Sequence, residues 1–317
     1  MSSNSSVTVS VPATTANLGP GFDCLGAALA LHNRFTFSRI AGSGAPLQLI
    51  VSGSDAQHMP IDASNLIYQA FTRLYDQIGE PVPAVRIVVE VGVPLARGLG
   101  SSATAIVGGL LGANALAGFP LRREAVMLLA ITLEGHPDNV VPALLGGCQL
   151  AVTNDSDPEV KTATTDWLIC DIPWHPEIVP IVAIPNFELS TQKARSVLPS
   201  HYSRQDASFN VAHLGLLLRA LETGNLDWLR AALQDRIHQP YRQALIPGYE
   251  AVHAAAMAAG ACGLVISGAG PTLLALAHQD QALVVEGALV TAWKHQGIGV
   301  YASSLKLDTQ GAVVHID

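Results

Sequence analysis

The sequence predicts an α+β protein built from two domains. At 317 residues the chain is too long for one ordinary domain and suits two domains of about 150 residues each. Apolar residues make up 49% of it, which is enough material for substantial cores. The expected strands and helices do not alternate strictly as strand, helix, strand, so an α+β arrangement is favoured over a doubly wound sheet.

In the N-terminal half, apolar residues that alternate with polar ones predict strands, and longer amphipathic runs predict helices. Pro12 is expected to stop the first strand, and Gly79 to end the first helix. The expected strands are 7–11, 35–40, 47–51, 85–93 and 146–153. The expected helices are 66–78, 101–117 and 122–133.

A polar segment, residues 154–165, is the predicted domain boundary. It gives an N-terminal ATP-binding domain of residues 1–160 and a C-terminal domain of residues 161–317. The second half is expected to hold strands at 167–172 and 178–184, helices within 201–235, and a helix at 249–259. Two strands that flank 267–271, a helix at 281–295 and terminal strands complete it.

Charge and composition exclude several classes of protein. The formal net charge is −8 and the four lysines are scattered, so a nucleic-acid partner is not expected. Four cysteines stand far apart without a CxxC pair, which is typical of small buried side chains in a reducing cytoplasm. The first six residues are polar and show no secretory signal. We therefore expect a cytoplasmic protein.

The uncharged stretch 98–121 has the length of a membrane span. It contains six glycines, and Asn114 and Pro120 interrupt its apolar character further. A buried helix that a glycine turn opens is the better interpretation, and no membrane partner is expected.

The strongest motif is the glycine-rich loop at 94–104, between an expected strand and an expected long helix. Gly98 and Gly100 allow a tight turn and close approach of a ligand. Ser101 or Ser102 can cap the helix, whose first N–H groups and positive end form an anion site. An ordinary strand-to-helix turn with a serine cap is the alternative. The chain has no Gly-Lys pair and no GxGxxG here, so neither a Walker A loop nor a dinucleotide fingerprint is present.

Two further glycine-containing loops stand near the ends of the chain. The segment 12–23, PATTANLGPGFD, places the polar residues Asn17 and Asp23 in a loop after the first strand. The segment 267–271, SGAGP, lies between two apolar strands. A turn stabilised by Asn and Asp side chains explains the first equally well, and a tight hairpin explains the second.

A cluster of polar residues follows the helix expected at 122–133. Glu134 is suited to Mg²⁺, because carboxylate oxygen is a hard ligand. His136 can be read as a general base or as a structural histidine, and Asp138 can be read as a functional carboxylate or as a residue that caps or orders the turn.

Taken together, these motifs resemble the GHMP kinase superfamily across nearly the whole chain. The segments 98–103, GLGSSA, and 267–271, SGAGP, resemble its phosphate-binding and C-terminal motifs. Sugar and mevalonate kinases of the superfamily open on a motif that ends in Gly-Glu-His, which is missing here. The segments 12–23 and 135–143 instead resemble the homoserine kinase members. The resemblance implies a ribosomal-S5-like N-terminal domain, a ferredoxin-like C-terminal domain and an active site between them.

The same resemblance implies roles for individual residues. Mg²⁺ would be held by Ser102 and Glu134, and Asn65 would lie near the adenine. L-homoserine would face Asn17, Asp23, Asn139, Arg195 and Arg236. The ATP phosphates would lie on the loop formed by Pro94, Leu95, Ala96, Arg97, Gly98, Leu99, Gly100, Ser101, Ser102, Ala103 and Thr104.

Transfer of the γ-phosphoryl group to the homoserine hydroxyl is the reaction that the resemblance implies. An arginine can bind the substrate carboxylate through two parallel hydrogen bonds, and Asp23 can pair with the ammonium group. Asn139 can orient the hydroxyl but cannot accept its proton, so catalysis without a dedicated side-chain base is expected. The resemblance also suggests a homodimer. A GHMP kinase acting on another alcohol and a nucleotide-binding module without catalysis are the alternatives.

Overall fold

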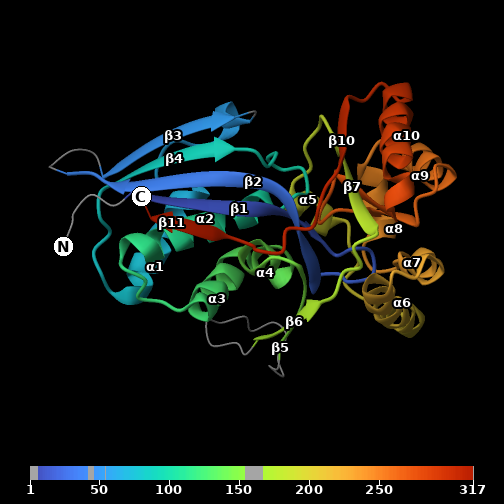
Figure 1. The fold of residues 1–317 in the computed structure, drawn as a ribbon, viewed down its shortest axis with the longest axis horizontal. Helices are drawn as coiled ribbons and strands as arrows, with labels where there is room; N and C mark the ends of the chain where they lie inside the picture. Colours follow the sequence, from blue (N-terminus) through green and yellow to red (C-terminus); the bar gives the residue numbers. More distant parts are fainter. Residues whose placement is uncertain (1–5, 42–45, 54, 154–166, 317) are drawn as a thin grey trace.

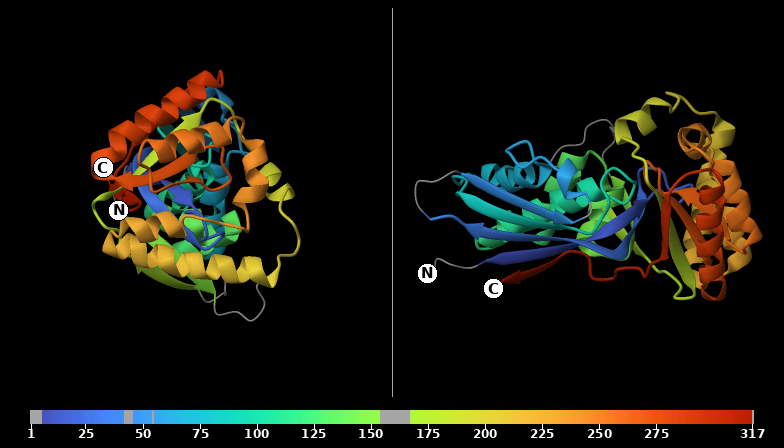
Figure 2. Two further views of the ribbon diagram at one scale, coloured as in Figure 1. Left: turned by 90° about the vertical axis from the view of Figure 1, so that its right-hand side faces the viewer. Right: turned by 90° about the horizontal axis from the view of Figure 1, so that it is seen from above.

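The computed structural model describes residues 6–41, 46–53, 55–153 and 167–316, and the boundary expected at 154–165 lies outside them. Within these residues the strands form one seven-stranded sheet and one four-stranded sheet. The bodies built on the two sheets lie end to end along the long axis of the molecule, with both termini on the larger body (Figures 1 and 2).

The larger sheet has the strand order β11-β1-β2-β4-β3, and β5 pairs with both β2 and β6. Its strands pair in antiparallel fashion except β3 and β4, which are parallel. The strands are β1 (Val7–Ala16), β2 (Leu25–Arg39), β3 (Leu47–Gly53), β4 (Val85–Val91), β5 (Cys148–Thr153), β6 (Trp167–Ile172) and β11 (Val313–Ile316). Because β6 and β11 belong to this sheet, the chain returns to the N-terminal body after residue 160. The division of the chain into two domains at residue 160 stays a prediction.

Four helices cover one face of this sheet: α1 (Leu66–Ile78), α2 (Ser101–Leu116), α3 (Arg123–Glu134) and α4 (Pro137–Leu145) (Figure 1). Helix α2 is buried along most of its length, because other helices cover the side that does not face the sheet. A Cβ atom on Gly108 would lie 2.4 Å from the ring of Phe35, and one on Gly112 would lie 2.2 Å from the ring of Phe37. Gly108 and Gly112 therefore let the helix approach the sheet. The buried helix expected within 98–121 is confirmed. Among the described helices, none has the length and apolar character needed to cross a membrane.

The smaller sheet has the strand order β10-β7-β9-β8, with every pair antiparallel. Its strands are β7 (Ile178–Pro185), β8 (Gly263–Ile266), β9 (Leu273–His278) and β10 (Val300–Ser304). With α9 (Tyr249–Ala258) and α10 (Ala282–His295), they follow one another as β-α-β-β-α-β, the ferredoxin-like sequence. The expected ferredoxin-like domain is confirmed. The remaining helices are α5 (Thr191–Ser196), α6 (Arg204–Thr223), α7 (Leu226–Ala232) and α8 (Gln239–Arg242).

Two expectations about the elements around the first loop were wrong. Strand β1 does not stop at Pro12 but continues to Ala16, because a register shift between Pro12 and Ala13 accommodates the missing N–H. Its partner β2 starts ten residues earlier than expected, at Leu25. The long β1–β2 pair carries residues 17–24 away from the larger sheet and toward the smaller one.

Helix α4 was not predicted at all. Pro137 occupies its first turn, where a missing N–H costs nothing, and the expected polar cluster therefore continues as a helix. The strand expected at 146–153 begins only at Cys148, because Gly146 and Gly147 both have positive φ.

The buried apolar side chains form three clusters, and the middle one joins the two bodies. It contains Leu18 and Leu99 from the N-terminal half together with Val182, Leu217 and Val265 from the C-terminal half. The two sheets are therefore packed through a shared core beside the loops described next.

Candidate active site

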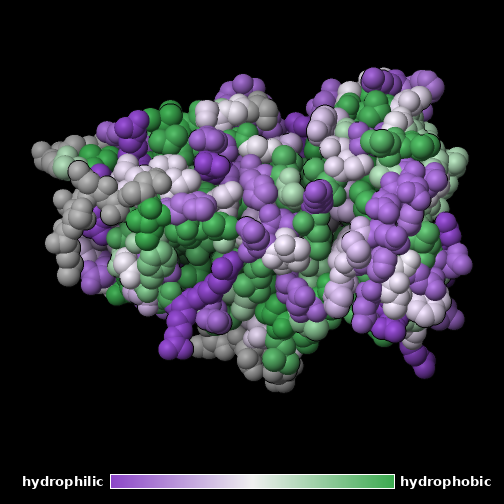
Figure 3. Space-filling model, viewed as in Figure 1, coloured by the Kyte–Doolittle hydropathy of each residue, from purple (hydrophilic) through white to green (hydrophobic). Residues whose placement is uncertain are grey.

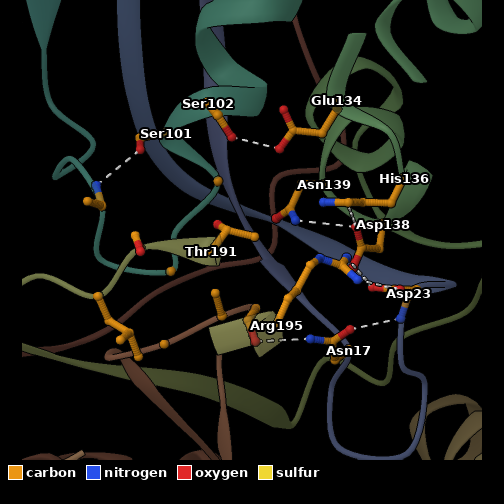
Figure 4. Close-up of a pocket in the computed structure, with 18 of the residues that line it drawn as sticks. Asn17, Asp23, Ser101, Ser102, Glu134, His136, Asp138, Asn139, Thr191 and Arg195 are labelled. Carbon is orange, nitrogen blue, oxygen red and sulfur yellow. Dashed lines mark hydrogen bonds and ion pairs between the residues drawn. The ribbon is translucent and has the colours of Figure 1, made fainter. Parts of the chain in front are cut away.

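A cavity of about 320 Å³ lies between the two bodies. Its walls come from the loop before α2, the β1–β2 loop, the start of α4, helix α5 and the loop 267–271 (Figure 4). Three of these segments contain the glycine motifs of the sequence, so the fold brings together all three motifs.

The N-terminus of α2 faces this cavity without a side-chain cap. Gly100 is the N-cap residue and has φ +67°, and neither Ser101 nor Ser102 caps the helix, contrary to expectation. Ser101 and Ser102 are instead the first two helical residues, and both line the cavity. The first N–H groups of a helix have no intrahelical acceptor, so these amides are available to an anion.

The three glycine loops are tied to one another by hydrogen bonds. Thr14 donates its backbone N–H to the Leu99 carbonyl at 3.1 Å, and the Ser267 hydroxyl donates to the Gly98 carbonyl at 2.6 Å. Asn17 Nδ2 donates to the Gly268 carbonyl at 3.0 Å. The loop before α2 is therefore held from both bodies at once.

Ser102 and Glu134 meet at the edge of the cavity. The Ser102 hydroxyl donates to Glu134 Oε1 at 2.7 Å (Figure 4). Burial raises the pKa of Glu134 above its ordinary value, although the bond from Ser102 opposes this shift. The pair presents two hard oxygen ligands, and no cluster of three or more His, Cys, Asp or Glu side chains suited to a metal occurs among the described residues. A donor set this small fits Mg²⁺, which binds through one or two protein oxygens and keeps its other ligands from phosphate and water.

Asn17, Asp23 and Arg195 form the opposite wall. Arg195 binds Asp23 through two hydrogen bonds of 2.7 and 3.0 Å, and Asn17 Oδ1 accepts the backbone N–H of Asp23. Burial disfavours the charge of Arg195, but the bonds to Asp23 outweigh it and raise the pKa of the guanidinium. Both Asn17 and Asp23 have positive φ, which aims their side chains at this point. The structure thus pairs two residues that the sequence suggested as separate contacts to a substrate.

His136, Asp138 and Asn139 lie beside this ion pair. His136 Nδ1 lies 2.5 Å from Asp138 Oδ1, and Asn139 Oδ1 accepts the Thr14 hydroxyl at 2.8 Å. Burial lowers the pKa of His136, but the bond to Asp138 and the neighbouring carboxylates outweigh it and leave the pKa above its ordinary value. His136 is therefore engaged with a carboxylate.

The loop residues expected to hold the phosphates divide into two groups. Those that line the cavity are Ala96, Gly98, Gly100, Ser101 and Ser102. The others, which do not line it, are Pro94, Leu95, Arg97, Leu99, Ala103 and Thr104. Leu99 and Ala103 belong to the apolar core, and Thr104 is buried against Asn33. These three residues support the loop from the interior of the protein.

Asn65 and Arg236 do not reach this cavity. Asn65 is the N-cap of α1, where Oδ1 accepts the Ile67 N–H and Nδ2 donates to the Pro60 carbonyl. Arg236 lies over the ring of Phe209, 4.0 Å from its centroid, and 3.7 Å from Asp206.

Arg242 lines the cavity and was missed by the sequence analysis. It is 2% exposed and donates to the carbonyls of Ala194 and Gly268. Among the described residues no carboxylate pairs with it, in contrast to Arg195. The segment 238–242 reads HQPYR, a short helix with Pro240 in its first turn, and this start signal would have placed Arg242 on an ordered element.

Comparison with known proteins shows the family. The family model for the GHMP kinases N terminal domain matches residues 65–147, and the model for the GHMP kinases C terminal domain matches residues 217–295. A homoserine kinase of Nostoc sp. is 64% identical over 312 residues, covering 98% of this chain and all of that protein. The chain belongs to the homoserine kinase family of GHMP kinases.

Other homoserine kinases are similar to this chain over its whole length. The homoserine kinase of Trichodesmium erythraeum is 58% identical over 99% of both chains. The crystal structure of homoserine kinase from Cytophaga hutchinsonii covers 99% of this chain and 98% of its own, at 29% identity and a TM-score of 0.86. Mevalonate kinase of L. major, at 17% identity and a TM-score of 0.66, shares the fold.

Proposed function

We propose that the chain transfers the γ-phosphoryl group of ATP to the hydroxyl of L-homoserine, giving O-phospho-L-homoserine and ADP. One observation carries the proposal: an uncapped helix N-terminus and a group of polar and charged side chains face each other across one cavity. Close relatives named homoserine kinase support the choice of substrate.

The phosphate half of the site is the start of α2. The N–H groups of the first helical turn and the hydroxyls of Ser101 and Ser102 would bind the transferred phosphoryl group and its neighbour. Ser102 and Glu134 would hold Mg²⁺, which would neutralise charge on the phosphates. Phosphoryl transfer has a loose transition state, so alignment and neutralisation of charge supply most of the catalysis.

The amino-acid half is the opposite wall. The carboxylate of homoserine would bind Arg242, whose guanidinium has no carboxylate partner among the described residues, with Arg195 beside it. The ammonium group would bind Asp23. The hydroxyl would then lie near Asn139, which lines the cavity between Asp138 and Gly100.

The transfer forms one bond to the γ-phosphorus, breaks one bond to it, and moves one proton. The hydroxyl oxygen of homoserine bonds to the γ-phosphorus while the bond from that phosphorus to the β–γ bridging oxygen breaks. The hydroxyl proton leaves late, to a phosphate oxygen, because Asn139, the side chain placed beside the hydroxyl, cannot accept a proton, and each described carboxylate of the cavity is bonded to another side chain. These pairs are Asp23 with Arg195, Asp138 with His136, and Glu134 with Ser102.

The reaction is tested by measuring ADP release from purified protein with MgATP and L-homoserine, mevalonate, galactose or shikimate. We expect release with L-homoserine, and phosphorus NMR should identify the phosphate ester. Release only with an alcohol that is not an amino acid would favour another GHMP activity. ATP binding without release for every alcohol would favour a non-catalytic module.

The absence of a side-chain base is tested by Asn139→Asp. The new carboxylate would lie where the hydroxyl is expected, so it could accept the proton. We expect kcat to rise and its pH profile to gain an acidic limb. A loss of kcat in His136→Ala with homoserine binding unchanged would instead identify a conventional base.

We also propose that the enzyme is a cytoplasmic homodimer, as the resemblance suggests. Light scattering on the purified protein measures its mass. A mass equal to that of one chain, 33.1 kDa, would contradict the dimer.

A further inference from the structure

Behind Arg242 the structure holds a buried histidine that the mechanism above does not use. His238 is 0% exposed and lies one helical turn before Arg242. Its ring is stacked on Phe22 with a centroid distance of 5.2 Å, and the guanidinium of Arg242 lies 5.2 Å from the same Phe22 ring. His238, Phe22 and Arg242 thus form one packed unit behind the cavity wall.

The two ring nitrogens of His238 have partners that define its protonation. Nε2 lies 2.8 Å from the Gly19 carbonyl oxygen, which can only accept a hydrogen bond. Nδ1 lies 3.4 Å from Arg242 Nη1, which can only donate. Both contacts are satisfied by one species alone: the neutral imidazole that carries its proton on Nε2 and accepts at Nδ1.

Asp235 is the group that could oppose this assignment, because its carboxylate is also buried and lies 3.6 Å from His238 Nε2. Its carboxylate is already stabilised by other donors, since it accepts four hydrogen bonds of 2.7 to 3.0 Å. The donors are Asn210 Nδ2 and the backbone N–H groups of residues 237, 238 and 239. Burial lowers the pKa of His238, and the positive charge of Arg242 acts in the same direction, while Asp235 opposes them.

Arg242 depends on few contacts for its orientation. Nε donates to the Ala194 carbonyl, and Nη1 is shared between the Gly268 carbonyl and His238. Among the described residues no acceptor bonds to Nη2. Because Nε and Nη1 are bonded to the protein, the Nη2 edge of the guanidinium remains available to a ligand.

We propose that His238 is a positioning residue for carboxylate recognition: as a neutral Nε2–H imidazole it links the Gly19 carbonyl to Arg242 and holds that guanidinium toward the substrate. This inference rests on the proposed function, because it takes the carboxylate of homoserine as the ligand of Arg242. It makes His238 act on the affinity for an amino acid and not on phosphoryl transfer.

A pair of amide substitutions separates the two contacts of His238. In His238→Gln the amide nitrogen can replace Nε2 and keep the bond to Gly19, but no acceptor is left for Arg242. In His238→Asn the amide oxygen can replace Nδ1 and keep the acceptor, while the bond to Gly19 is lost. Both variants lose the ring stacked on Phe22, so each serves as the packing control for the other.

The readout is the Kd of L-homoserine and of propanolamine, which is homoserine without its carboxylate, by calorimetry. We expect His238→Gln to weaken homoserine binding roughly tenfold, the effect of losing a hydrogen bond to a charged group. We expect His238→Asn to weaken it clearly less, and propanolamine and ATP to bind both variants as they bind the wild type. Equal losses of homoserine affinity in the two variants, or a parallel loss for propanolamine, would overturn the proposal and leave His238 a packing residue.

Nitrogen NMR on the wild-type protein tests the protonation without using activity. The His238 signals, assigned through bonds from the backbone amide of His238 in the wild-type protein, should show an unprotonated Nδ1 and a protonated Nε2 near neutral pH. A doubly protonated ring, or a proton on Nδ1, would refute the inference even if both variants failed to fold. If the wild type showed the expected ring but phosphorylated no homoserine, the proposed function would fail while the assigned role of the ring as acceptor for Arg242 would stand.

Discussion

The charged side chains of the cavity are paired before any substrate arrives. Asp23 holds Arg195 through two hydrogen bonds, and Asp138 holds His136. Arg242 is the exception, because it is bound by backbone carbonyls and by His238 and by no described carboxylate. A substrate that brings its own carboxylate therefore completes the charge balance of this wall.

Glu134 gives a prediction for the pH dependence of the reaction. Burial raises its pKa above the ordinary value, and only the ionised form would bind Mg²⁺ well. As the pH falls, the carboxylate should lose its charge earlier than an ordinary glutamate, so the acidic limb of kcat/KM for ATP should lie at a higher pH than an ordinary glutamate would give. Glu134→Gln should lower kcat on the order of 100-fold and remove this limb, measured by ADP release across pH.

Glu124→Gln, on the exposed start of the same helix, is the control and should leave kcat and the acidic limb unchanged. An unaltered acidic limb in Glu134→Gln would exclude Glu134 as its cause.

Asp23 gives a prediction for substrate affinity. Asp23→Asn removes the proposed partner of the ammonium group and leaves Arg195 without its counter-charge. We expect KM for homoserine to rise about tenfold or more while KM for ATP stays the same. Asp227→Asn is the matched control, because Asp227 forms an exposed ion pair with Arg230 on α7, away from the cavity. A change in KM for ATP alone would contradict the placement of Asp23 in the amino-acid half.

At the scale of single elements, the short connection between β4 and α2 determines where the helix starts and what its first amides face. Gly100 ends this loop with φ +67°, and a Cβ atom there would lie 1.9 Å from Thr14 Oγ1 and 3.1 Å from Asn139 Oδ1. The absence of a side chain at Gly100 therefore matters for space as well as for backbone conformation.

Gly100→Ala tests this element. It should destabilise the protein by more than the ~1–2 kcal/mol that a left-handed alanine costs, and ATP turnover should fall, because Thr14 and Asn139 must move. Gly79→Ala is the control, since Gly79 has φ +71° at the end of α1 and nothing within 4 Å of the added Cβ. Urea unfolding and ADP release measure the two effects. An equal loss of stability in both variants, with turnover retained, would show that crowding at Gly100 is unimportant.

The elements also show which local signals were sufficient. Helix α1 follows its expected limits, because Asn65 caps its start, Gly79 ends it in the left-handed conformation, and its apolar side chains share one face. Helix α4 was missed, since His136, Pro137 and Asp138 read as a polar turn. Its stability comes from burial of Val140, Val141 and the residues that follow, which local sequence does not reveal.

At the scale of the whole molecule, the site exists only because the two bodies share a core and exchange hydrogen bonds. Ser267 lies after β8 in the smaller body, yet its hydroxyl donates to the carbonyl of Gly98 and contacts the Thr15 hydroxyl of the larger body. The phosphate loop is thus supported by a residue 169 positions further along the chain.

Ser267→Ala tests this link. Loss of the hydroxyl leaves the buried Gly98 carbonyl and Thr15 hydroxyl without this partner, so stability should fall by about 1–3 kcal/mol. KM for ATP should rise, because the loop before α2 loses its support. Ser303→Ala, on β10 with a single weak bond to a neighbouring carbonyl, should change neither quantity. Unchanged unfolding in urea for Ser267→Ala would show that the two bodies are held by other contacts.

The surface of the whole molecule mixes polar and apolar side chains, and apolar ones gather near β5 and β6 in the view of Figure 3. Val152 on β5 and Leu168 on β6 are 48% and 56% exposed. A leucine or valine of this kind on a surface is ordinary, and its exposure does not identify a partner. The light-scattering measurement therefore tests the proposed homodimer.

Local chemistry was enough to indicate the α+β class, the buried helix α2, the anion site at its start and the polar residues Asn17, Asp23, Ser102 and Glu134. Each of these depends on a few neighbouring residues: a glycine turn, the start of a helix or a hard oxygen ligand. Their common location was implied by the resemblance to a family and not by spacing, because loops 80 and 170 residues apart meet only when both sheets are formed.

Tertiary packing decided which of Arg236 and Arg242 reaches the cavity. Arg236 and Arg242 are six residues apart and equally charged, and nothing in their local sequence separates a surface position from a wall of the site. The short helix α8, the ring of Phe22 and the buried His238 place Arg242 at the cavity, while Arg236 lies over Phe209. The direction of a long side chain depends on what its neighbours bury, and those neighbours come from distant parts of the chain.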